Sequence, residues 1–219
     1  MNDTSKTSSN AEQTKARLIK EGIQLFALHG ISGIRTRQLA DAAGANQSAI
    51  PYHFGGKLGV YTAVIEHIAN ELAAEIHFEE FDNELAANSV NKPAAETLAV
   101  LIRFLVTGLC RALLAPEREY YSQIILREQL EPTESYQLIY NHLIEPFHIR
   151  LAQLIRLNNN THSEQTITIR AHAIIGQILG FVIARKAFLL RINATNFSNQ
   201  LLESITEEIS SLSINALLN

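Results

Sequence analysis

The chain of 219 residues is long enough to form one or two domains with a substantial hydrophobic core. Hydrophobic residues make up 47% and charged residues 18%, the balance of an ordinary globular protein, and no charge-free apolar stretch is long enough to cross a bilayer. The single cysteine, Cys110, excludes an intrachain disulfide, so a reducing cytoplasm is the expected compartment.

The net charge of −4 is distributed unevenly along the chain. Residues 1–60 contain seven Lys and Arg against four Asp and Glu, so the remainder of the chain carries the excess of negative charge. A basic N-terminal quarter joined to an acidic body indicates that only the N-terminal part meets phosphate groups. Modest asymmetries of this kind also arise by chance.

The N-terminal region predicts a lead-in followed by a helix. Residues 1–12 are polar and lack the apolar centre of a secretory signal, so we expect a disordered segment there. Apolar residues recur at helical spacing between Thr14 and His29. Gly30 is placed to end this helix.

Residues 36–57 predict two short helices around a tight turn. The hydroxyl of Thr36 can cap the first helix, Gly44 stands where the chain must leave it with a positive φ, and Asn46 can cap the second. So short a connection sets the two helices at a steep angle, as in a helix-turn-helix whose second helix enters the major groove of DNA. Helical hairpins also occur away from DNA, so a purely structural hairpin stays an alternative.

The outward-facing residues of the second helix have the chemistry of a DNA reader. Gln47 can make a bidentate contact to adenine, and Ser48 can donate or accept at a base edge. Tyr52 and His53 can bond phosphate oxygens. Lys57, at the start of the next helix, is a candidate cation for a phosphate.

The rest of the chain reads as further helices, with no alternating strand pattern and no repeat. A long helix is expected from Lys57 to Ile76, and Pro146 is expected to kink a later one. The other predicted helices cover residues 94–114, 118–130, 133–157, 164–192 and 199–218.

The predicted helix over residues 164–192 is apolar around most of its circumference and must be covered on every side. One chain lacks enough neighbours to do so, which predicts a homodimer whose interface is a four-helix bundle of the last two helices of each subunit. Gly176 and Gly180 allow another helix to approach closely, although packing within one chain explains them equally well. The expected interface residues are Gly176, Ile178, Leu179, Gly180, Ile183, Leu201, Ile205, Ile209 and Leu212.

These segments resemble a known family. Residues 14–72, with Phe26, Gly30, Thr36, Gly44, the run Tyr52-His53-Phe54 and Lys57, resemble the DNA-binding domain of TetR-type (TetR/AcrR) transcriptional regulators. Residues 127–132, 144–146 and 170–176 resemble the C-terminal domain of the CecR-like branch.

The resemblance implies an all-α homodimer that binds a palindromic DNA operator, usually as a repressor. A helix-turn-helix DNA-binding domain would span residues 13–58, and a larger helical domain for effector binding and dimerisation would span residues 59–219. A small-molecule effector would shift the helix that starts near Lys57 and so change the spacing of the two recognition helices. By the same resemblance, Thr36 and Arg37 would touch the DNA backbone, Gln47, Ser48 and Ala49 would face bases, and Tyr52, His53 and Lys57 would hold phosphates.

Pro51 departs from the family pattern, because many members have a residue with a free N–H at this point in the recognition helix. We expect the proline to cost a backbone hydrogen bond and to limit the helix to about one turn.

The sequence says little about the effector. Polar residues on the middle helices are candidates to contact it, although each is more often an ordinary, partly buried polar group: Arg103, Tyr120, Tyr121, Arg127, Glu128, His142 and His148. Arg127 beside Glu128 is either an anion hook or a structural ion pair. His142, Glu145 and His148 are spaced by three and drift around the helix, so neither a metal nor another cofactor is expected.

Two rival classes of function remain. An enzyme is not expected, because the sequence has no glycine-rich phosphate loop, nucleophile elbow or zinc signature. An all-helical interaction or scaffold protein without DNA binding is the second rival. It predicts that Lys57→Ala and Tyr52→Ala leave every activity unchanged.

Overall fold

The computed structural model describes residues 4–88, 93–159 and 161–218, and in these residues every regular element is a helix, as expected. The chain divides into two compact units. The first combines Met1–Ile68 with Gln123–Ile139, and the second combines Ala69–Ser122 with Tyr140–Asn219. The compact units therefore do not follow the boundary expected after residue 58, because a segment from the middle of the chain joins the N-terminal helices.

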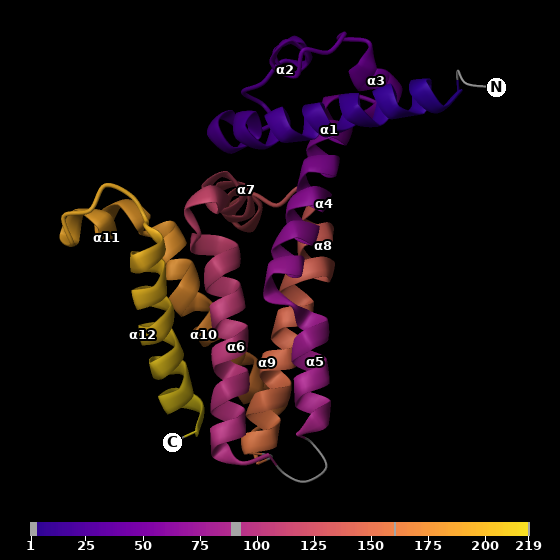
Figure 1. The fold of residues 1–219 in the computed structure, drawn as a ribbon. Helices are drawn as coiled ribbons and strands as arrows, with labels where there is room; N and C mark the ends of the chain where they lie inside the picture. The colour runs from indigo at the N-terminus through magenta and orange to yellow at the C-terminus, as the bar shows by residue number, and fades with distance from the viewer. Residues whose placement is uncertain (1–3, 89–92, 160, 219) are drawn as a thin grey trace. The chain divides into compact units, whose positions relative to one another are not determined.

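The first unit is a small helical bundle (Figure 1). Aromatic side chains lie at its centre. It contains α1 (Thr4–His29), α2 (Thr36–Ala42), α3 (Ala49–Phe54), the start of α4 (Lys57–Ile76), the end of α7 (Glu119–Leu130) and α8 (Tyr136–Ile139). Phe26 and Tyr61 are fully buried and meet edge to face, with ring centroids 5.0 Å apart. Leu18, Leu39 and Ile50 bring α1, α2 and α3 into the same core.

The α7–α8 segment is tied to this bundle by polar contacts. The fully buried Glu128 accepts hydrogen bonds from the Tyr61 hydroxyl at 2.7 Å and from the Thr133 N–H at 3.0 Å. Arg127 donates to the carbonyl oxygen of Ala27 at 3.3 Å. Burial and the Glu128 hydrogen bond raise the pKa of Tyr61, so its hydroxyl stays protonated and can donate.

The second unit is organised around α6 (Ala95–Leu114), which packs against α5 (Phe78–Ala87), α9 (Glu145–Asn158), α10 (Glu164–Ile183) and α12 (Asn199–Leu218) (Figure 1). It also contains the 3-10 turn Pro116–Arg118 and α11 (Arg185–Arg191). Cys110 lies fully buried on α6, and desolvation raises the pKa of its thiol to about 12, so the thiol stays protonated and unreactive at neutral pH.

Two helices of this unit, α6 and α10, have the length and mean hydropathy, 1.9 and 1.6, of a membrane span. The expectation that no charge-free apolar stretch reaches bilayer length holds, because Arg103 and Arg111 interrupt α6 and Arg170 interrupts α10. α6 is mostly buried, as in the core helix of a globular protein. α10 is not, since only 22% of its apolar window is buried.

Three helices begin or end differently from the sequence prediction. The helix α1 extends back to Thr4, so residues 4–12 of the expected disordered lead-in are helical, and residues 1–3 lie outside the described part of the chain. Pro146 occupies the first turn of α9, directly after a π-helical turn at Tyr140–Ile144, because the proline has no N–H to continue the preceding helix. The helix predicted over residues 164–192 breaks at Ala184 into α10 and α11.

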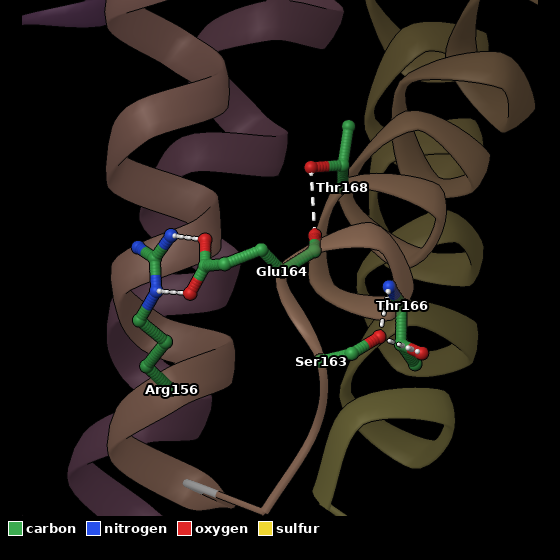
Figure 2. Close-up of polar contacts among 5 residues, drawn as sticks. All are labelled: Arg156, Ser163, Glu164, Thr166 and Thr168. Atoms are coloured by element: carbon green, nitrogen blue, oxygen red, sulfur yellow. Dashed lines mark hydrogen bonds and ion pairs between the residues drawn. The ribbon is translucent and has the colours of Figure 1, made fainter.

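The start of α10 is capped, as Figure 2 shows. The Ser163 hydroxyl accepts a 3.1 Å hydrogen bond from the Thr166 N–H, one of the donors that the first turn of a helix leaves unpaired. Glu164, the first residue of the helix, forms a two-pronged ion pair with Arg156 at the end of α9. These contacts fix the direction in which α10 leaves the α9–α10 loop.

Candidate nucleic-acid interface

The turn between α2 and α3 has the predicted geometry. Gly44 has a φ of 57°, in the left-handed region that favours glycine. The N–H of Ala45 reaches back to the carbonyl of Ala40 at 2.9 Å, which closes the end of α2.

The start of α2 corrects one detail of the prediction. The helix begins at Thr36, but its cap is Arg35, whose N–H donates to the side-chain oxygen of Gln38 at 2.8 Å. The sequence predicted that the Thr36 hydroxyl would accept a backbone N–H at the start of the helix, and the side chain of Gln38, at the third helical position, accepts one instead. Thr36 is half-buried, and the exposed Arg37 lies 3.7 Å from Asp41.

The recognition helix α3 is preceded by a turn in which Asn46 binds Ser48. The Asn46 side-chain oxygen accepts hydrogen bonds from the N–H and the hydroxyl of Ser48, at 3.0 and 2.9 Å. The residue that precedes α3 is Ser48, whose side chain forms no capping hydrogen bond, so Asn46 binds the residue before the helix and is not the cap that was predicted. The hydroxyl of Ser48 is occupied unless it exchanges this bond for one to DNA. Gln47 is exposed in the turn before the helix, Ala49 is half-buried, and Ile50 is buried in the core.

Pro51 costs less than expected. It is the third residue of α3, and a helix leaves its first four N–H groups without partners inside the helix. The carbonyl of Gln47 accepts from Ile50, and that of Ser48 accepts from Tyr52, so the missing donor breaks no bond. The helix is short, six residues, as predicted. Tyr52 is 83% exposed, and His53 beside it is half-buried.

Lys57 has a structural role that the sequence did not reveal. Its ammonium group donates to the carbonyls of Ile31 and Ile34, both at 2.7 Å, and is partly buried. It therefore fastens the loop between α1 and α2 to the start of α4. Two of its three N–H donors are therefore committed within the protein, and a contact of Lys57 with a phosphate stays a prediction.

Comparison with known proteins decides the family. The tetR family of bacterial regulatory proteins matches residues 18–64, and the C-terminal domain of the HTH-type transcriptional dual regulator CecR matches residues 98–217. The chain is 31% identical to CecR of Shigella flexneri over 90% of this chain and 88% of that protein. The chain belongs to the TetR family. It is a DNA-binding transcriptional regulator.

Other TetR-family relatives are more distant. The regulator SrpR of Pseudomonas putida is 28% identical over 64% of this chain and 57% of its own length. The crystal structure of PfmR from Thermus thermophilus matches with a TM-score of 0.60 over 91% of this chain and 97% of that one, at 14% identity. That match shows a shared fold.

The predicted effector residues of this TetR-family chain do not gather at one place. Arg127 and Glu128 belong to the first unit, where they form hydrogen bonds with Ala27, Tyr61 and Thr133. Neither forms the expected ion pair with another described residue. The remaining candidates belong to the second unit and have separate surroundings. Tyr120 is half-buried, Tyr121 lies under the Arg118 guanidinium, His142 bonds Asn70 at 2.7 Å, and His148 stacks on His172.

Among the predicted effector residues, Arg103 lines a cavity of about 290 Å³. The cavity lies between α6 and the junction of α4 with α5. Val100 and Phe104 supply apolar surface there, and Arg111 lies two turns along α6 from Arg103. Arg103 pairs with Glu207, whereas Arg111 is exposed and has no ion pair with any described residue. Arg111 was not predicted from the sequence, although its spacing from Arg103 was a usable signal.

The predicted dimer residues divide into buried and open ones. Ile178, Ile205 and Ile209 are buried inside the second unit, which corrects their assignment to an interface, and Leu179 and Leu201 are half-buried. Ile183 and Leu212 are 64% and 58% exposed. A Cβ added to Gly176 or Gly180 would meet no described atom within 4 Å, so packing within the chain does not explain these glycines.

Proposed function

We propose that this TetR-family regulator binds a palindromic operator as a homodimer and acts as a repressor that a small organic ligand releases. The observation that carries the proposal is the geometry of α3. Ile50 holds the helix in the core while Gln47, Tyr52 and His53 stay outside with hydrogen-bonding groups that suit base edges and phosphates.

The open face of α10 supports the dimer. Ile169, Gly176, Gly180 and Ile183 fall within about 60° of one another around the helix axis, at about 100° per residue. These four residues form an apolar stripe, in which Ile169 is 61% exposed. The stripe is open at Gly176 and Gly180, which carry no side chain. The same stripe from a second copy fits against it around a two-fold axis.

Dimer geometry explains how a ligand controls DNA binding. A palindromic operator presents half-sites about 34–36 Å apart, or a multiple of that, so each recognition helix works only at the correct spacing. A ligand that favours another spacing by about 3 kcal/mol lowers operator affinity on the order of 100-fold.

We place the ligand in the cavity lined by Val100, Arg103 and Phe104, and we propose that Arg111 binds an anionic group of the ligand.

Relatives favour a regulator in the cytoplasm without enzymatic activity, since their names describe transcriptional regulators. CecR is named a dual regulator, so the direction of control needs its own test. A reporter gene behind the operator distinguishes the two outcomes: repression predicts higher expression when the regulator gene is deleted, and activation predicts lower expression.

Fluorescence anisotropy with the DNA next to the protein's own gene tests the proposal. We expect binding that weakens as salt rises, because phosphate contacts release counterions. Gln47→Ala is expected to change the preference among base pairs by about 1–3 kcal/mol without abolishing binding. If the protein does not bind this DNA at low salt, the operator lies elsewhere. If it also fails to select any fragment from genomic DNA, the scaffold alternative is favoured.

A further inference from the structure

The helix α1 forms one wall of a groove beside the recognition helix. The groove has a volume of about 590 Å³. On the α1 side it is lined by Asn10, Ala11, Thr14 and Arg17. On the helix-turn-helix side it is lined by Gly44, Ala45, Asn46, Ala49, Tyr52 and His53. The groove is therefore continuous with the surface of α3 that faces outward.

The α1 residues of the groove share one helix face. Asn10, Thr14 and Arg17 are separated by four and three residues, so their side chains are neighbours along the helix. They also line a second hollow of about 420 Å³, which Gln13 and Ala16 complete. Asp and Glu are missing from the lining of both hollows.

Arg17 is the cation of this groove. Its side chain is exposed and donates to the Thr14 hydroxyl at 3.4 Å, and it forms no ion pair with any described carboxylate. Two other cations of this unit are paired: Lys15 with Glu12 at 3.1 Å and Arg37 with Asp41 at 3.7 Å. A Cβ at Gly44 would lie 3.8 Å from the Arg17 guanidinium, so this charge sits against the turn that leads into α3.

We propose that α1 is part of the DNA interface and that Arg17, with Asn10 and Thr14, binds a phosphodiester flanking the bases read by α3. The proposal rests on operator binding as described above. An acid-free groove with a guanidinium and an amide complements an anionic oxygen. The Thr14 hydroxyl donates to the Asn10 carbonyl at 2.8 Å and binds a phosphate oxygen only by exchanging this hydrogen bond. Contacts of this kind fix the register of a protein on the duplex and carry no sequence information themselves.

The chemistry favours a phosphate over a base edge. Each phosphate that a side chain neutralises steepens the salt dependence of binding, with a slope of about −0.9 per contact in log–log form. A contact to a base edge changes sequence preference instead. The two roles of Arg17 are therefore separable by one titration at several salt concentrations.

The experiment measures operator affinity of the full-length protein by fluorescence anisotropy from low to moderate salt. Arg17→Gln and Arg17→Ala are expected to weaken binding to the operator and to unrelated duplexes by similar factors, and to reduce the salt slope by about 1 per protomer on the DNA. Arg17→Lys, which keeps the charge, is expected to restore the slope. Lys15→Ala removes the same charge from the opposite side of α1 and is expected to leave the slope near that of the wild type.

Each other outcome has a definite meaning. If Arg17→Gln and Lys15→Ala have the same slope while the wild type binds the operator, α1 makes no such contact, and the proposed function stands. A changed base preference with an unchanged slope overturns the phosphate assignment. Failure of the wild type to bind any duplex overturns the operator proposal as well. Thermal melts of every variant show whether a loss of binding comes from a loss of folding.

Discussion

The hydroxyl of Tyr61 on α4 donates a 2.7 Å hydrogen bond to the carboxylate of Glu128 on α7, 67 residues away in the sequence. Both side chains are fully buried, and Glu128 also accepts from the N–H and the hydroxyl of Thr133. The contact connects two segments of one compact unit, and its loss leaves a polar group without a partner in the core.

We therefore expect Tyr61→Phe to lower the free energy of unfolding by about 1.5–3 kcal/mol, the range for a hydrogen bond to a charged group. Urea denaturation followed by circular dichroism measures the change. Tyr52→Phe removes the same hydroxyl from an exposed position and serves as the control. Equal stability of the two variants contradicts the structural role of the Tyr61 hydroxyl.

Lys57→Met should impair operator binding through the loop between α1 and α2. The substitution keeps the apolar stem but removes both hydrogen bonds to the Ile31 and Ile34 carbonyls, which leaves these acceptors to water or without a partner. We expect lower stability together with weaker DNA binding, and faster amide exchange at residues 31–35. A variant with wild-type exchange and stability that loses only DNA affinity indicates a direct phosphate contact instead.

Gly176→Glu is expected to dissociate the proposed dimer. The new side chain has room in the single chain, since no described atom lies within 4 Å of the added Cβ, but a second copy brings two carboxylates together in an apolar interface. Analytical ultracentrifugation should show a monomer that is folded. Gln153→Glu adds one negative charge at an exposed position on α9 and should leave the dimer intact. A Gly176→Glu dimer as strong as the wild type places the interface elsewhere.

The stacked pair of His148 and His172 makes stability depend on pH. Burial first, and the charge of His172 second, lower the pKa of His148 in the folded chain. The unfolded chain therefore binds a proton more readily, so this contribution is complete above about pH 6.5 and decreases as the pH falls through 6.5 toward the folded pKa.

Urea denaturation at pH 7.5 and 5.5 measures this contribution. We expect the wild type to lose more stability than His148→Gln over this interval, because glutamine does not titrate. His162→Gln, which replaces a histidine in the loop before α10, should behave like the wild type. An identical loss in the wild type and in His148→Gln assigns the pH dependence to other groups.

Local chemistry was predictable from the sequence, and tertiary placement was not. Gly44 has the left-handed conformation that its residue type predicts, because that conformation depends on neighbours within a few positions. The all-α fold class followed from helical periodicity in the same way.

Long-range placement decided the rest. The carbonyls that bind Lys57 lie 23 and 26 residues away, so no local pattern reveals them. The apolar residues of α12 illustrate the same limit. Ile205 and Leu212 are equally suited to a core or an interface, and only the neighbouring helices of the fold bury the first and expose the second.

The discontinuous composition of the first unit has a consequence for evolution and for engineering. The recognition helix shares its core with a segment that the chain supplies only after α6, at Gln123–Ile139. A gene fusion that exchanged only the first 68 residues between regulators would separate Tyr61 from its own Glu128. The incoming helices would then pack against residues 123–139 of a different regulator. An exchange of operator specificity that keeps a folded protein must therefore carry two separate gene segments, or else replace only the exposed residues of α3.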